Sequence, residues 1–455
     1  MGAILTIIIS VIIYTIKILQ NSRNLSYDKW SEIFISFFVF TNCLNFGLTL
    51  FEIPDSTPYS STIRIEVYMI IAPVFITLLA KRNQWRLPNI HWLWILLGAF
   101  FIAINILNPA NINKTGTIIA IFNIVSYLIF LYIVTSSTST DVIIKGVYEG
   151  LTYTLILEGI AVFAYAIGIK QIATFFREGA SIRSELRPGA PGTFAHPNPL
   201  GIYLSYIYCF FLSCYMLNYR KRRSLYLTIA TVMVLIPTYS RSSLMSIVFA
   251  SIIIISLFKT QNSSIFSVKN IFTRILPIII IALAAVFLTP LRNSFIGSNM
   301  DEMMIARLLH YYFGLLVFSQ NPVLGVGLNS HVQYMTANFN FRSLGDINLI
   351  YDIFLFYRPV HNIWIIWLAE FGIIGFIFIV SYFIYHFYKI KPTLRSDLST
   401  ENKIASMTSI GIICCFMVQG MGDPAPLGLQ IAQLWILFFF LHTAPQCKMR
   451  SPESP

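Results

Sequence analysis

A single arginine separates two apolar runs in the middle of the chain. Arg241 lies in "TYSRSS" (238–243), a turn with almost no loop. Arginine carries a planar, permanently charged fork that suits phosphate oxygens. An arginine at the edge of a membrane is costly and normally faces a cavity or an anion. These properties predict that Arg241 binds an anionic group; the alternative is an interface anchor that reaches lipid headgroups.

A second arginine, Arg307, belongs to a predicted amphipathic helix over 301–318. The segment opens with two acids, which suit a helix N-terminus, and "NP" at 321–322 ends it. Arg307 precedes His310 by three residues and Tyr311 by four. The three side chains can therefore share one face of the helix. Anion binding by Arg307 competes with a plainer interpretation, the solvated face of an amphipathic helix.

A histidine stands directly before the apolar run that follows this segment. His361 opens "HNIWIIWLAEFGIIGF" (361–376). Imidazole has an unperturbed pKa near 6.5, so it can take a proton from a hydroxyl at neutral pH. His361 is therefore a candidate general base, with a helix cap or interface residue as the alternative. Three further residues are candidate accessory groups: Arg187, His196 and Arg358.

The chain lacks the motifs of nucleotide-dependent and metal-dependent chemistry. It contains no Walker sequence, no "GxGxxG", no "HExxH" and no clustered aspartate pair of the kind that a metal-dependent glycosyltransferase uses. The six cysteines lie mostly in apolar runs and suit packing better than a disulfide or a zinc site. We therefore predict no cofactor and no metal.

The composition defines the elements that must position these residues. Hydrophobic residues make up 56 % of the 455 residues and charged residues only 11 %, whereas soluble domains contain about 25 % charged residues. This predicts an all-α polytopic integral membrane protein. The formal charge of +12 falls mainly in short loops, where it indicates topology and not a nucleic-acid partner.

A membrane span needs roughly 17–25 apolar residues, and thirteen runs qualify. They lie near 2–19, 31–53, 65–80, 91–107, 115–135, 147–169, 197–218, 223–239, 242–258, 274–290, 362–387, 403–421 and 427–442. If the first run is not a span, or two runs are wrongly divided, twelve spans are the natural variant. The fold class is thus about 12–13 transmembrane helices with a large, partly helical outer loop.

The positive-inside rule orients these spans. Short basic loops at 81–86, 219–224, 259–274 and 388–395 are predicted to be cytoplasmic. The opposite side holds 108–114, 170–196, 238–243, 291–361 and 420–427. Arg241, Arg307 and His361 therefore share the outer side. The chain divides into 1–290 with ten transmembrane helices, 291–361 as the large outer loop with its amphipathic helix, and 362–455 with the remaining transmembrane helices and a short cytoplasmic tail.

Three segments in order, "TYSRSSLM", "NPVLGVGLNS" (321–330) and "HNIWIIWLAEFGIIGF", resemble the O-antigen ligase / Wzy-type polysaccharide polymerase family. The segment "RPGAPGTFAHPNPLGIYL" (187–204) is also similar to a "G-F-x-H-P-N" segment of that family. The resemblance covers about 187–376 well and the remainder only in hydropathy.

The resemblance implies a GT-C-like glycosyltransferase in the bacterial cytoplasmic (inner) membrane, whose outer side and active site face the periplasm. It implies a glycan donor on undecaprenyl diphosphate and neither metal nor nucleotide. Matched by motif, Arg241 and Arg307 would bind the diphosphate and His361 would act as base. The implied acceptor is a second lipid-linked repeat unit or the lipid A-core. With either acceptor, the resemblance is compatible with a chain-length regulator as a further protein partner.

Three functions remain open from the sequence. A polymerase of repeat units is favoured, because the basic segment 170–187 could hold a second diphosphate and the "HPN" segment points the same way. The Arg-x10-Gly pattern of one polymerase subtype is missing from the arginines of the outer loops, which counts against that subtype. An O-antigen ligase shares the donor chemistry and is the alternative. A flippase or other transporter of lipid-linked oligosaccharide is more distant.

Overall fold

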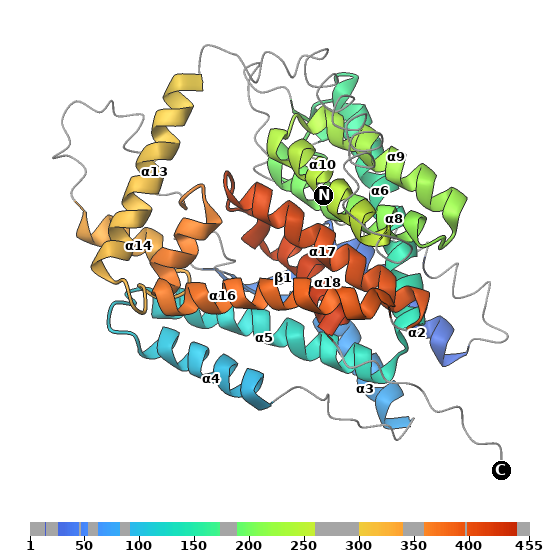
Figure 1. Cartoon of the computed structure of the whole chain (residues 1–455), viewed down its shortest axis with the longest axis horizontal. Helices are drawn as coiled ribbons and strands as arrows, with labels where there is room; N and C mark the ends of the chain where they lie inside the picture. Colours follow the sequence, from blue (N-terminus) through green and yellow to red (C-terminus); the bar gives the residue numbers. More distant parts are fainter. Residues whose placement is uncertain are drawn as a thin grey trace.

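A computed structural model describes residue 14 and the ranges 26–44, 47–52, 62–81, 92–172, 189–259, 300–339, 359–395 and 398–443. These ranges form helices with one short hairpin (Figure 1), which confirms the predicted all-α class. The elements are α2 (Tyr27–Asn42), β1 (Gly47–Glu52), β2 (Thr62–Glu66), α3 (Val67–Lys81), α4 (Trp92–Leu107), α5 (Lys114–Ser137), α6 (Thr140–Ala166), α8 (Pro197–Met216), α9 (Lys221–Leu235), α10 (Arg241–Lys259), α13 (Met300–Gln320), α14 (His331–Asn338), α16 (Ile363–Arg395), α17 (Thr400–Gly420) and α18 (Leu429–Thr443), with short 3-10 turns η1 (Ile236–Thr238) and η3 (Ala425–Leu427).

Six helices of the described ranges are long and apolar enough to cross a membrane: α5, α6, α8, α10, α16 and α17. The apolar parts of α3 and α18 are shorter. The chain is therefore a multi-pass membrane protein. The predicted span at 274–290 lies outside the described residues, as does 2–19 apart from Tyr14. The total of 12 or 13 spans stays a prediction.

The predicted span 31–53 is wrong beyond Asn42. Helix α2 ends there, and residues 47–52 form β1, which pairs antiparallel with β2 so that Gly47 faces Glu66 and Glu52 faces Thr62. Glycine disfavours a helix, and the alternation of Thr49 with its leucine neighbours is typical of a strand. Hydropathy alone could not separate these two structures.

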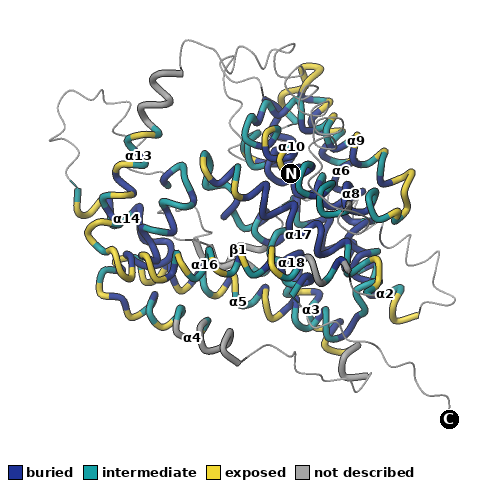
Figure 2. Tube along the Cα trace, viewed as in Figure 1, coloured by how far each residue is buried: buried dark blue, intermediate teal, exposed yellow. Residues whose placement is uncertain are grey.

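The most buried of the six described spans are α17 and α8. In their apolar stretches, 83 % and 78 % of the residues are buried. Figure 2 shows the same concentration of buried residues along these two helices. Helices α9 and α10 pack on α8, and α10 also packs on α17. Gly201 permits the close approach of α8 to the start of α10, because a Cβ at this position would lie 2.6 Å from Cβ of Ser240. The five described cysteines are all buried, as their predicted packing role requires.

Helix α16 is broken at Gly372, which has φ 62° and ψ −169°. The break leaves backbone groups without helical partners, and the segment 322–327 supplies new ones. The carbonyls of Ala369 and Glu370 accept hydrogen bonds from the amides of Val326 and Gly327, at 2.9 and 2.8 Å. In return, the amide of Ile373 donates to the Pro322 carbonyl at 2.8 Å. Two of the motifs noted in the sequence, "NPVLGVGLNS" and "AEFG", thus form one backbone-paired unit.

Asparagine side chains of the 108–113 turn hold the other side of this unit. Asn108 Nδ2 donates to the Gly325 carbonyl at 2.8 Å, and Asn113 Nδ2 donates to the Asn329 carbonyl at 2.8 Å. The side chains of His331 and Glu370 are fully buried, and His331 Nδ1 lies 2.6 Å from Glu370 Oε1. The outer segment after α13 is therefore fixed to α4, α5 and α16 by buried polar contacts, which places α13 beside the start of α16.

We expect Gly372→Ala to reduce the amount of folded protein. A Cβ at this position would lie 2.3 Å from the Val323 carbonyl oxygen, and the φ/ψ values of Gly372 belong to a region almost confined to glycine, at a cost of about 1–3 kcal/mol for other residues. Gly98→Ala in α4 is the control, because nothing lies within 4 Å of its Cβ. Thermal unfolding in detergent should show a clear drop for the first variant only; equal stability of both would mean that the break at Gly372 is not needed.

Candidate diphosphate and base site

Arg241 is the first residue of α10 and follows a tight turn. Helix α9 passes into η1, and Tyr239 takes a left-handed conformation (φ 53°) that ends it. The hydroxyls of Ser240 and Ser243 then hydrogen-bond at 2.8 Å within the turn. The Arg241 side chain is partly exposed. The turn is as short as predicted, and of the two helices that it joins, α10 is long and apolar enough to cross a membrane.

Arg307 lies on α13, which extends the predicted helix 301–318 to Met300–Gln320. The guanidinium groups of Arg307 and Arg241 are close enough to repel each other electrostatically. These residues are 66 positions apart and come from different helices. The fold therefore brings two like charges into the same region, an arrangement that favours an anion near both.

His361 lies just before α16, and His310 faces it from α13. Their Nδ1 atoms are 3.0 Å apart, and the two rings are stacked with centroids at 5.0 Å. His361 is partly exposed, whereas His310 is buried. The neighbouring Asn362 caps α16, since its Oδ1 accepts from the amides of Trp364 and Ile365 at 2.9 and 3.2 Å.

The three predicted residues are thus connected by one charge interaction, one helical turn and one hydrogen bond. Arg241 interacts with Arg307, Arg307 lies one helical turn before His310, and His310 meets His361. Arg241, the α13 residues and His361 come from three separate segments of the chain (Figure 1). The grouping contains fixed positive charge and an imidazole pair, which are the groups needed to hold an anion and to accept a proton.

The turn between α17 and α18 joins this region to His196. His196 caps α8, where its Nδ1 accepts from the Asn198 amide at 3.2 Å. Asn198 Nδ2 then donates to Asp423 Oδ2 at 2.9 Å. Two residues away, the Met421 carbonyl accepts from the Tyr311 hydroxyl at 2.8 Å. Asp423 was not predicted to be a site residue, although an aspartate directly before proline is a typical turn signal.

The other two accessory candidates, Arg187 and Arg358, lie outside the described residues. Just after Arg187, the amide of Ala190 donates to the Pro237 carbonyl at 2.9 Å. The chain that follows Arg187 therefore runs against the turn that carries Arg241.

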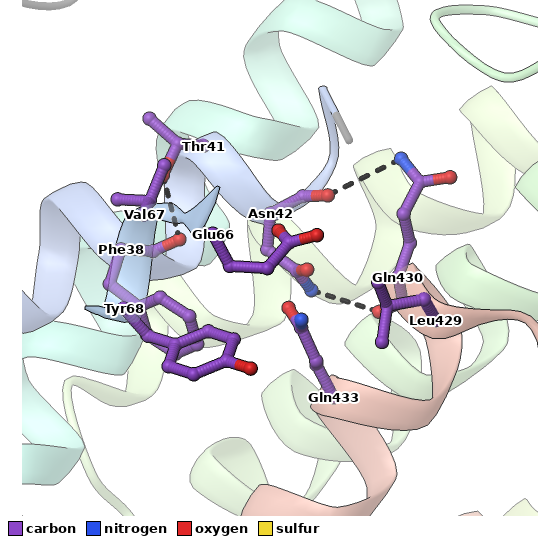
Figure 3. Close-up of a pocket in the computed structure, with 9 residues that line it drawn as sticks. All are labelled: Phe38, Thr41, Asn42, Glu66, Val67, Tyr68, Leu429, Gln430 and Gln433. Carbon is purple, nitrogen blue, oxygen red and sulfur yellow. Dashed lines mark hydrogen bonds between the residues drawn. The ribbon is translucent and has the colours of Figure 1, made fainter. Parts of the chain in front are cut away.

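A small pocket lies elsewhere, between α2, β2, α3 and α18 (Figure 3). Asn42 and Gln430 tie its walls together, with Asn42 Nδ2 donating to the Gln430 carbonyl at 2.9 Å. Its lining contains none of the predicted site residues. It consists of Phe38, Thr41, Asn42, Glu66, Val67, Tyr68, Leu429, Gln430 and Gln433.

The fold and the site together define a multi-pass helical membrane protein with an arginine and histidine cluster built from the starts of α10 and α16 and from α13. A family model described as O-antigen ligase matches residues 225–380, which contain Arg241, Arg307, His310 and His361. This match supports the resemblance seen in the sequence: residues 225–380 are similar to the O-antigen ligase family. The match supports a general role in ligase- or polymerase-type glycan assembly. A comparison with curated proteins finds no match.

Proposed function

We propose that this protein transfers a glycan from undecaprenyl diphosphate to a sugar hydroxyl on the periplasmic side of the bacterial inner membrane, as a polymerase of repeat units. The observation that carries the proposal is the convergence of Arg241, Arg307 and the His310–His361 pair from three helical segments. The family match over the same residues supports the reaction class.

In this proposal the two arginines hold the donor diphosphate. Their mutual repulsion is relieved when an anion binds near both. Each guanidinium can make two parallel hydrogen bonds to phosphate oxygens. Because the negative charge on the diphosphate grows as the glycosyl bond breaks, fixed cations stabilise the transition state more than the ground state. The arginines thus serve the role that a divalent metal serves in other glycosyltransferases, and we propose a reaction without one.

The transfer step then needs one base. His361 accepts the proton of the acceptor hydroxyl, and the oxygen forms a bond to the anomeric carbon of the donor. The bond between that carbon and the diphosphate oxygen breaks, and lipid diphosphate leaves with the electron pair. The proton on His361 passes to water before the next cycle. Partial exposure of His361 suits this role, because the base must reach an acceptor that arrives from outside.

The acceptor separates the polymerase from the second candidate, an O-antigen ligase that transfers the chain to lipid A-core. The description of the matching family model favours the ligase. The basic segment 170–187 and the "HPN" segment of the sequence favour the polymerase. Both candidates use the same donor and the same cluster of Arg241, Arg307 and His361.

The glycan profile of a deletion strain tests the proposal. Loss of a polymerase should leave a single repeat unit on the core, because one unit can still be ligated. Loss of a ligase should leave bare core while lipid-linked polymer accumulates. Complementation with the wild-type chain should restore the profile in either case. Unchanged long-chain glycan in the deletion strain would contradict both candidates.

A further inference from the structure

Helix α13 presents an apolar face to the outside of the protein. Leu308, Tyr312 and Leu315 follow one another at intervals of four and three residues, so they lie on one side of the helix. Their side chains are 54 %, 57 % and 45 % exposed. A continuous exposed apolar face of this kind marks a surface that contacts another molecule or lipid.

The opposite side of α13 is already occupied by protein. His310, Phe313 and Val317 are buried there. Gly314 lets the helix approach α16 closely, because a Cβ at this position would lie 2.5 Å from Cγ2 of Ile365. The exposed face is therefore not part of this contact, and a rotation of α13 that buried it would expose the other side.

The exposed face of α13 continues into the surface of a membrane span. The turn that follows α13 exposes Val323 and Leu324. Its backbone is paired with α16 just after the break at Gly372, where the amide of Ile374 donates to the Val323 carbonyl at 3.4 Å. Ile373 and Ile374 are themselves exposed apolar residues of that span, and such residues face lipid tails. The apolar turn thus connects the face of α13 to lipid-facing surface.

The length of α16 places this turn near the edge of the membrane. Its apolar stretch Ile363–Ile390 has 28 residues, which is about 42 Å of helix, whereas the hydrocarbon core is about 30 Å thick. The part after Gly372 is about 27 Å long and nearly crosses the core by itself. Helix α13 ends at the turn beside Gly372 and runs across the direction of α16 and α5 (Figure 1). Its exposed face therefore lies at the level where headgroups meet acyl chains.

We propose that the face formed by Leu308, Tyr312 and Leu315 lies in the outer leaflet of the membrane, so that α13 is an interfacial helix. An apolar face with a tyrosine suits this boundary, where tyrosine is enriched. Because Arg307 directly precedes Leu308, the same contact holds this arginine near the level of the headgroup phosphates. The inference concerns the surface beside the site and does not depend on the proposed reaction.

Spin labels at single cysteines test the contact with lipid. Leu308→Cys and Leu315→Cys would each carry a nitroxide in a Cys447→Ser background, since the five described cysteines are buried and should stay unlabelled. Ile377→Cys, an exposed position in the span of α16, is the lipid control, and Lys221→Cys, an exposed charged position, is the water control. Each labelled protein would be shown by gel filtration to be folded and then placed in nanodiscs of phosphatidylcholine and phosphatidylglycerol without polyprenyl lipid.

Electron paramagnetic resonance then compares collisions of the label with oxygen, which dissolves in lipid, and with a nickel chelate, which stays in water. We expect the ratio of oxygen to nickel collisions in the two α13 variants to be several-fold higher than in Lys221→Cys and to approach that in Ile377→Cys. A ratio equal to that of Lys221→Cys would overturn the inference. If one α13 variant does not fold, the other decides alone.

Two further outcomes would also overturn the inference. Shielding of the α13 labels from both reagents would mean that protein, such as a second copy of this chain, covers the face. A lipid-like ratio that arises only after a polyprenyl diphosphate is added would mean that the face binds the chain of that lipid and not the bilayer.

Discussion

Replacing His361 by alanine is expected to lower the rate of glycan transfer about 10²- to 10⁴-fold, the range that a general base contributes. The side chain lies at the start of α16, partly exposed and hydrogen-bonded to His310. It does not contribute to the helix cap, which Asn362 supplies. The variant should therefore insert and fold, bind the lipid diphosphate donor with nearly wild-type affinity, and lose turnover.

A second substitution at the same position sharpens this prediction. His361→Gln keeps a polar side chain with a lone pair but has no basic nitrogen, so we expect it to be as inactive as His361→Ala. Turnover and donor affinity should be measured on the same reconstituted samples. If either variant retained more than about a tenth of wild-type turnover, His361 could not be the base, because even the weakest general bases contribute more.

Replacing Arg241 or Arg307 by alanine should reduce kcat about 10²- to 10³-fold, as removal of one preorganised donor does elsewhere, and should weaken donor binding as well. The two guanidinium groups influence each other electrostatically, and in the proposed function both bind the donor diphosphate. Lysine at either position should restore only part of the loss, because a point charge does not replace the planar fork. Steady-state kinetics with varied donor concentration measures both effects.

Arg223 provides the matched control for the arginines. It is an exposed arginine whose Nη1 lies 3.1 Å from Glu149 Oε1 in a different part of the fold. An exposed ion pair of this kind contributes only about 0–1 kcal/mol, so Arg223→Ala should keep turnover within about threefold of wild type. Loss of turnover in the control equal to that in Arg241→Ala would show that the effect is general and not a property of the site.

Much of this arrangement could be predicted from hydropathy and loop charge. The apolar runs around Arg241 correspond to α9 and α10, and α13 appears where its acids and the "NP" pair predict it. The basic loops placed Arg241, Arg307 and His361 on one side, and the cluster that they form is consistent with that placement. These features depend on local composition, which a sequence displays directly.

The remaining features depend on contacts between distant segments. The break of α16 at Gly372 occurs inside a single predicted span, 362–387, where hydropathy does not mark a break. The pairing of His310 with His361 joins residues 51 positions apart. The hydrogen bond from Asn198 to Asp423 spans 225 positions. Local patterns in a single sequence do not indicate that residues so far apart along the chain meet in the fold.

The most direct test of the account is the stoichiometry of transfer in vesicles that contain only the purified protein. The vesicles would be supplied with a polyprenyl-diphosphate-linked glycan and an acceptor glycan, and both products would be quantified by mass spectrometry. The account predicts one lipid diphosphate released for each new glycosidic bond, with both products lost in His361→Ala. Movement of the intact donor between leaflets without cleavage, as a flippase would produce, would contradict it.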